Sequence, residues 1–148
     1  MGDRCSVRIF CATEDKQKIL KIFNDDYPPD DEDEVGGGWW MHFYECNYGR
    51  EAELREAAAT GLIFHGDSGA GMDYGPLVFA AQSGLLFEAE ANQEGFPMTE
   101  VTRDGPEPGG IATAMRYYQA VDNAKAHILT SKATDRRTIR NAMHARRH

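Results

Sequence analysis

The sequence contains no run of about 18 apolar residues, the length that a membrane-spanning helix needs. Its first residues also lack the long apolar stretch of a secretion signal. The chain has 3 cysteines, an odd number, which does not predict a disulfide framework. We therefore expect a cytoplasmic protein with reduced thiols and no membrane partner.

Basic residues are scarce over most of the chain. The formal net charge is −8, with 24 Asp and Glu against 16 Lys and Arg. Residues 1–122 hold 23 acidic and 9 basic residues, whereas residues 123–148 hold one acidic and 7 basic residues. Because an acidic body repels a nucleic-acid backbone everywhere except at the basic tail, direct nucleic-acid binding is disfavoured. A protein partner with a basic, nucleic-acid-binding surface is favoured instead.

The sequence also lacks a complete catalytic motif. Residues 66–71 contain a Gly-Asp-Ser-Gly order similar to that around the nucleophile of trypsin-like proteases, but the chain is too short for that fold. A serine nucleophile elbow needs glycine where this chain has Ala70, and no lysine follows the glycines as a phosphate-binding loop requires. We predict no catalysis. If this loop contacts a ligand, the candidate residues are His65, Asp67, Ser68 and Asp73.

The three cysteines and one histidine are candidates for a zinc site. Cys5 and Cys11 would share one face of a first strand, and His42 and Cys46 one face of a second. Structural zinc ligands usually lie about two to four residues apart in a loop, unlike these. Cysteine in a strand more often acts as a small hydrophobic residue. We therefore predict no metal and no cofactor.

The most informative feature that is present is an acidic run. Seven of the ten residues from Asp25 to Glu34 are acidic, Pro28 and Pro29 interrupt them, and three glycines follow. This composition predicts a long loop over residues 25–37. Three interpretations stay open: a solvated flexible loop, a contact for a basic partner, or a divalent metal site without the spacing of a calcium-binding loop.

Two consecutive tryptophans, Trp39 and Trp40, come directly after the glycines. Neighbouring side chains of a strand point to opposite faces, so we expect one tryptophan in the core and one exposed beside the acidic run. An exposed tryptophan next to a charge cluster resembles an interface hot spot, unless helices cover both faces of the strand. The predicted partner-binding residues are Asp30, Asp31, Glu32, Asp33, Glu34, Trp39 and Trp40.

Apolar periodicity predicts the secondary structure. Period-two alternation indicates a half-buried strand over residues 4–12, and a run rich in aromatic residues indicates a second strand over residues 39–46. Shorter strands are predicted over residues 62–64, 77–81, 85–89 and 96–102. Helices are predicted over residues 13–24, with Thr13 as N-cap, over 50–60 and from Gly110 onward. The order favours an α+β fold, a mainly antiparallel sheet of about five to six strands with helices packed on one face as a two-layer sandwich.

We expect a single globular domain over residues 1–131 and a basic C-terminal tail over residues 132–148. The last long helix should pack through one apolar stripe. Its members are Ile111, Ala114, Met115, Tyr118, Val121, Lys125 and Ile128. In the tail, His144 and His148 lie one helical turn apart and could bind a metal weakly, but solvent exposure explains them more simply.

These observations favour a small acidic cytoplasmic protein that inhibits or regulates a macromolecule with a basic surface. Its carboxylates would occupy a groove of Lys and Arg that normally receives phosphates. Phage and mobile-element inhibitors, such as anti-CRISPR proteins, are similar in size and charge, which is a likeness of type and not of sequence. Two alternatives stay open: an immunity protein or antitoxin that neutralises a toxin, and a small enzyme or ligand-binding domain that uses residues 65–75.

Overall fold

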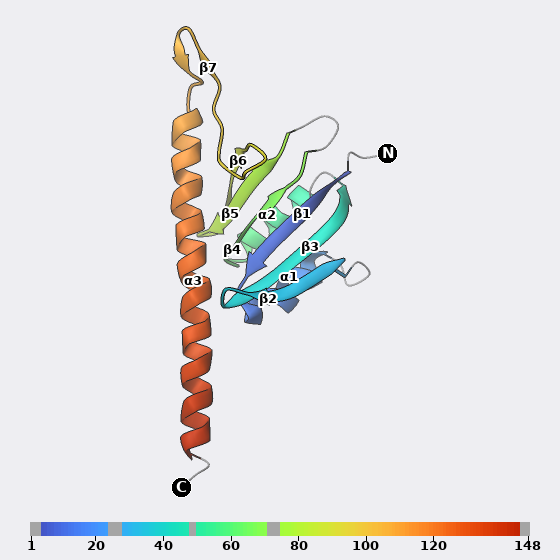
Figure 1. The fold of residues 1–148 in the computed structure, drawn as a ribbon, viewed down its shortest axis with the longest axis vertical. Helices are drawn as coiled ribbons and strands as arrows, with labels where there is room; N and C mark the ends of the chain where they lie inside the picture. Colours follow the sequence, from blue (N-terminus) through green and yellow to red (C-terminus); the bar gives the residue numbers. More distant parts are fainter. Residues whose placement is uncertain (1–3, 24–27, 48–49, 71–74, 146–148) are drawn as a thin grey trace.

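The computed structural model describes residues 4–23, 28–47, 50–70 and 75–145, with side chains described from Cys5 to Ser131 within these ranges (Figure 1). Its main element is a six-stranded sheet in the order β2-β3-β1-β4-β5-β6, and every neighbouring pair is antiparallel. The strands are β1 Arg4–Cys11, β2 Asp31–Val35, β3 Gly38–Asn47, β4 Phe64–Ser68, β5 Leu77–Gln82 and β6 Leu85–Glu90. A separate small ribbon pairs β7 Val101–Thr102 with β8 Gly105–Pro106.

Four helical segments accompany the sheet in the described part of the chain. They are the 3-10 turn η1 Thr13–Asp15 and the α-helices α1 Lys16–Phe23, α2 Glu51–Ala59 and α3 Gly110–Ala145. From β1 to β4 the chain follows a β-α-β-β-α-β order, in which β3 lies between β1 and β2 in the sheet. The predicted α+β class, with a mainly antiparallel sheet, is confirmed.

Helices α1 and α2 pack on one face of the sheet and enclose the larger core. Val7 and Ile9 of β1 and Met41 and Phe43 of β3 point to this face and are almost completely buried. These residues alternate with polar or partly exposed ones, as the period-two pattern predicts. The core is completed by Cys11, Ile19, Phe23, Cys46, Leu54, Ala57, Ala58, Phe64, Phe79 and Ala81.

Helix α3 lies on the opposite face and covers only one half of it. Val78 and Ala80 of β5 pack against Tyr117, Ala120 and Val121 of α3 in a second, smaller core. Across β1, β2 and β3, the described helices leave this face uncovered, except at its end, where Ile128 of α3 lies close to Gly38. In Figure 1 these three strands lie in front of α1 and α2, with α3 to one side. We call this uncovered half the open face.

The packing face of α3 differs from the predicted stripe. Ile111, Met115 and Tyr118 are 57%, 60% and 39% exposed, whereas Ala120 and Ala124 are fully buried. Alanine lets the helix backbone approach the sheet closely, so small residues occupy the contact and several larger ones remain outside. The predicted stripe was wrong in its first half and at the exposed Lys125, because spacing of three and four residues does not by itself show which face of a helix contacts the sheet. Val121 and Ile128 are buried, as predicted.

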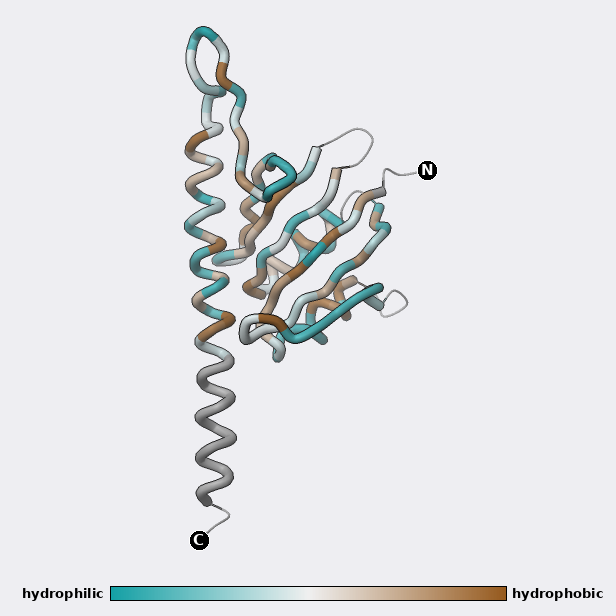
Figure 2. The backbone as a smooth tube through the Cα atoms, in the orientation of Figure 1, coloured by the Kyte–Doolittle hydropathy of each residue, from teal (hydrophilic) through white to brown (hydrophobic). Residues whose placement is uncertain are grey.

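The acidic run does not form the long loop that its composition predicts. Asp31–Val35 is the edge strand β2, all five of its residues are exposed, and it is the teal strand at the sheet edge in Figure 2. Gly36 and Gly37, at φ 56° and 97°, form a two-residue turn that returns the chain to β3. This Gly-Gly turn fits the twist of a β-hairpin and imposes pairing on residues of low strand propensity. Residues 25–27 lie outside the described part of the chain.

Other predicted boundaries shift by a few residues. Thr13 is not the N-cap: the helical segment starts with η1 after Ala12, and no side chain caps it. Strand β4 runs to Ser68, which shortens the glycine-rich loop. The strand predicted over residues 96–102 is reduced to Val101–Thr102, plus an isolated bridge between Ala91 and Pro97. Proline and glycine between these short pieces limit further pairing.

Helix α3 continues without a break to Ala145, so the backbone of the basic tail is helical up to that residue and projects beyond the sheet (Figure 1). None of the described helices combines the length and apolar character needed to cross a membrane.

A substitution at Gly66 tests the packing between β1 and β4. A Cβ atom there would overlap the Arg8 carbonyl oxygen and come within 2.8 Å of Phe79 Cζ. We expect Gly66→Ala to lower the free energy of unfolding by about 1–3 kcal/mol, because neither backbone nor ring can yield easily. Urea unfolding of the parent and the variant measures this change in the free energy of unfolding. Gly75→Ala is the control, since no other atom lies within 4 Å of the position that its added methyl group would take; equal stability of the two variants would contradict the prediction.

Candidate functional site

The open face is built from side chains of β1, β2 and β3 that point away from α1 and α2, and β4 continues it toward α3. The strand register arranges them in two rows that each cross four strands. One row contains Asp33, Trp40, Phe10 and His65. The next contains Asp31, His42, Arg8 and Asp67. Each row therefore begins with a carboxylate on the edge strand and continues over a ring on β3.

Aromatic rings cover much of this surface. The His42 ring centroid lies 5.7 Å from that of Trp40 and 4.8 Å from that of Tyr44, so three rings line up along β3. Phe10 and His65 stack across β1 and β4 with centroids 5.0 Å apart and planes 8° from parallel. Tyr44 is 52% exposed, and the other four rings are partly buried. Flat rings at the surface offer contact area with little conformational entropy to lose.

The two tryptophans point to opposite faces, as the strand pattern predicts. Trp40 belongs to the open face, whereas Trp39 packs against the larger core. Lys16 Nζ lies 4.1 Å from the centroid of the Trp39 ring and 3.1 Å from Glu32 Oε1. This contact links β2 to α1 on the face of the sheet that α1 and α2 cover, which we call the helix side. Both tryptophans are partly buried, so the division into one core and one fully exposed residue is less sharp than expected.

The alternation of β2 and β3 therefore places the predicted partner-binding residues on two faces of the sheet. Asp31 and Asp33 are on the open face with Trp40, whereas Glu32 and Glu34 are on the helix side with Trp39. Asp30 precedes the strand, and its Oδ2 accepts a hydrogen bond of 2.7 Å from the Tyr44 backbone N–H. A contiguous acidic loop was expected. Alternation along β2 instead places its acidic side chains on two sides of the molecule.

Charges on the open face are unevenly compensated. Arg8 Nε donates to Asp67 Oδ1 at 2.9 Å, so these two residues form an ion pair. In the described part of the chain, no basic side chain forms an ion pair with Asp31 or Asp33. Asp33 Oδ1 accepts only the neighbouring Glu34 backbone N–H, at 2.7 Å, among described donors. The β2 end of the face is thus anionic and next to aromatic rings, which is an environment that attracts a guanidinium or ammonium group.

The glycine-rich segment does not assemble a catalytic set among the residues described. His65 and Asp67 point to the same side of the sheet as the open face, but Ser68 is buried on the opposite side of β4, 5% exposed. Burial, together with the nearby Lys125 charge, lowers the pKa of His65 to about 4, so this imidazole is neutral at pH 7. Asp73 lies outside the described residues.

The geometry also separates the four candidate zinc ligands. Cys5 and Cys46 are opposite each other on β1 and β3, and Cys11 is at the other end of β1; all three are buried. His42 is on the open face, so the prediction that it shares a face with Cys46 was wrong, because an irregularity in the β1–β3 register beside Cys46 interrupts the strand period. Burial, with a smaller effect of the Asp15 charge, raises the pKa of the Cys11 thiol to about 12, so it stays protonated. Local sequence reasoning missed a different group, Glu14, Asp15 and His127, because no short motif joins residues of η1 and α3.

No protein-family model matches the chain, and neither a curated protein nor a solved structure matches it.

A pH titration tests the environment of His65. Its folded-state pKa of about 4 lies below the ordinary value of 6.5, so the folded protein disfavours the protonated ring. The neutral His65 ring therefore contributes to the free energy of unfolding above pH 6.5. This contribution is lost as the pH falls through 4, because the unfolded chain binds the proton at a higher pH than the folded protein does. We expect His65→Phe, which keeps a ring beside Phe10, to reduce the loss of unfolding free energy between about pH 7 and pH 5. Parallel curves of unfolding free energy against pH for the parent and the variant would contradict the environment assigned to His65.

Proposed function

We propose that this chain is a small acidic binding protein that captures a cationic segment of another protein and thereby inhibits or regulates it. The observation that carries the proposal is the open face: half of a sheet face, uncovered by the described helices, where aromatic rings adjoin the carboxylates of Asp31 and Asp33. The working residues are Asp31, Asp33, Trp40, His42 and Tyr44. We propose no catalytic step.

The charge of the protein supports a cationic partner. The net charge of −8 attracts a basic protein over a distance, and exposed carboxylates of β2 meet it first. Within the contact, an arginine or lysine can lie over Trp40 or Tyr44 while Asp31 or Asp33 accepts its hydrogen bonds. The rings contribute buried area, and the carboxylates contribute orientation and association rate.

Edge strand β2 offers a second means of contact. Its outer side is not paired with another described strand of the sheet, so its backbone groups can accept an added strand. Its acidic side chains oppose pairing with a second copy of the same acidic strand, and they favour a basic strand. This selectivity fits a binder of a basic partner better than self-association.

Aromatic rings on an open sheet can also stack on the bases of a single-stranded nucleic acid. The carboxylates of Asp31 and Asp33 at the end of each row would repel its phosphates, and Arg8 is already paired with Asp67. A basic protein that itself binds nucleic acid is therefore the favoured partner. In that case this chain would occupy the groove that the nucleic acid normally fills, as an inhibitor of phage or mobile-element type does.

Neutralising two carboxylates tests the electrostatic part of the proposal. We expect Asp31→Asn with Asp33→Asn to slow association with a synthetic arginine-rich peptide by about tenfold at low salt. The difference should shrink at physiological ionic strength, where charges are screened over about 8 Å. Stopped-flow binding measures both. The matched control is Glu94→Gln with Asp104→Asn, which removes the same charge from exposed turns elsewhere. Equal loss in the two variants, or tighter binding of a single-stranded oligonucleotide than of the peptide, would refute the assigned surface.

Replacing Trp40 tests the aromatic part. We expect Trp40→Ala to accelerate dissociation of the same peptide and to cost about 2 kcal/mol of binding free energy, because a ring at the centre of a contact excludes water. Phe96→Ala is the control, since Phe96 is a 55% exposed ring outside the open face. Circular dichroism establishes that both variants are folded. A Trp40 variant that releases the peptide as slowly as the Phe96 variant would remove Trp40 from the site.

A further inference from the structure

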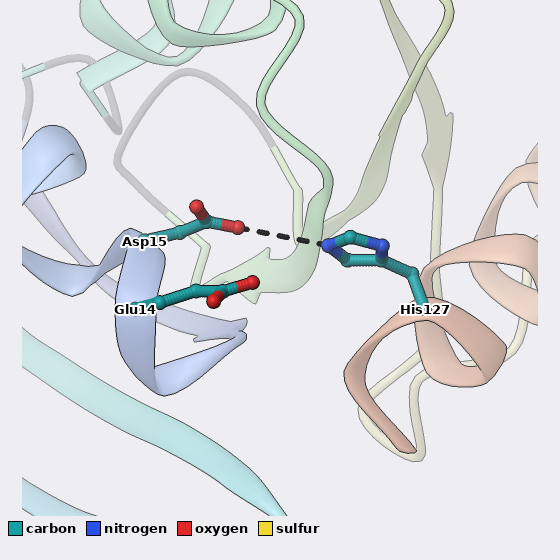
Figure 3. A group of neighbouring side chains, drawn as sticks. All are labelled: Glu14, Asp15 and His127. Carbon is teal, nitrogen blue, oxygen red and sulfur yellow. Dashed lines mark ion pairs between the residues drawn. The ribbon is translucent and has the colours of Figure 1, made fainter. Parts of the chain in front are cut away.

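A second site lies where η1 approaches α3, away from the open face. Glu14 and Asp15 of η1 point toward His127 of α3, and Figure 3 shows the three side chains converging on one gap. They line a cavity of about 450 Å³. The remaining cavity wall is formed by Lys18, Lys21, Ile22, Thr60, Gly61, Leu62 and Ile63. The cluster therefore joins two segments that are far apart in the sequence.

The three ligand-capable groups are close enough to share one ion. One donor atom from each residue lies within 4.8 Å of the other two, and Asp15 Oδ2 is 3.7 Å from His127 Nε2. Ligands held about 2.1 Å from a tetrahedral metal ion are separated from one another by about 3.4 Å. The observed spacing needs only small side-chain movements to reach that geometry.

Asp15 provides an independent indication. It is one of the two polar or charged residues that are buried in the described part of the chain, with 7% of its surface exposed. Its side-chain contacts are with His127 and Lys18, both at 3.7 Å, which is longer than a charge-assisted hydrogen bond. Lys18 meets the other carboxylate oxygen, Oδ1, and its side chain is 68% exposed. A buried carboxylate needs closer compensation than these contacts supply.

We propose that Glu14, Asp15 and His127 form a binding site for a divalent transition-metal ion of the zinc class. One imidazole nitrogen and two carboxylate oxygens are suitable donors for Zn²⁺, and the two carboxylates balance its charge. Three protein ligands leave one position of a tetrahedral ion open for water or another ligand. The ion would also link η1 to α3, and so fix the helix on the sheet.

The linkage gives a direct test with zinc alone. The full-length protein is stripped with chelator and dialysed, and its melting temperature is measured as Zn²⁺ is added. We expect one Zn²⁺ per chain by calorimetry and a rise of about 5 °C or more when zinc exceeds its Kd a hundredfold, because the ion binds the folded state. Mg²⁺ at the same concentration should raise it less, since it prefers oxygen ligands.

Ligand variants separate this site from other sources of zinc binding. We expect Asp15→Asn and His127→Gln each to weaken zinc affinity by at least about 100-fold, the upper range for loss of a supporting group around a metal. His144→Gln with His148→Gln is the control for binding by the tail. Glu14→Gln is a milder third variant, because Glu14 is exposed and its loss does not leave a buried charge unpaired.

Three outcomes of these measurements are distinguishable. Loss of the zinc effect in the Glu14, Asp15 and His127 variants, with the tail variant unchanged, supports the site. Loss in the tail variant alone assigns the zinc to His144 and His148 and overturns the proposal. A parent protein whose melting temperature does not respond to Zn²⁺ also overturns it, and leaves Asp15 and His127 as a polar contact between η1 and α3. The Glu14 variant keeps the test valid if either of the other two does not fold.

Discussion

The close approach of β1 and β4 at the centre of the sheet decides the arrangement of everything around it. Gly66 leaves no side chain there, and the Phe79 ring and the Arg8 carbonyl group occupy the space. The contact joins β4, which pairs with the β5–β6 hairpin on its other side, to β1 and the strands beyond it. That hairpin supplies the apolar surface on which α3 packs. Because α3 follows the hairpin, it covers one half of the sheet and leaves the other half open.

Unequal coverage explains the chemical difference between the two halves. Strand β5 has helices on both faces, and its residues are apolar throughout most of its length. Strands β1 and β3 are covered mainly on one face, so buried residues alternate with the exposed Arg8 and the partly buried Phe10, Trp40 and His42. The same alternation on β2 supplies carboxylates to both sides of the edge. The same acidic residues of β2 thus oppose pairing of the sheet edge with another acidic strand and attract a basic partner.

The position of α3 also relates the two proposed sites. Ile128 packs next to Gly38 at the end of the open face, and the preceding residue, His127, faces Asp15 on η1. A metal ion held by Asp15 and His127 would therefore restrain the helix that bounds the open face. The two sites are separate, because one is a cavity beside η1 and α3 and the other is an exposed strand surface.

The α+β class, the core face of β1 and the opposite directions of Trp39 and Trp40 could be predicted from residue order alone, because the last two depend on the two-residue period of a strand and the first on the order of the elements. The charge asymmetry could be read in the same way. Contacts between distant segments established the other features. Pairing with β3 made a strand of Asp31–Val35 despite its low propensity, close packing selected Ala120 and Ala124 for the face of α3, and the path of α3 brought His127 to Asp15. Such contacts between distant segments leave no local pattern in the sequence, because each partner is polar, small or exposed when considered alone.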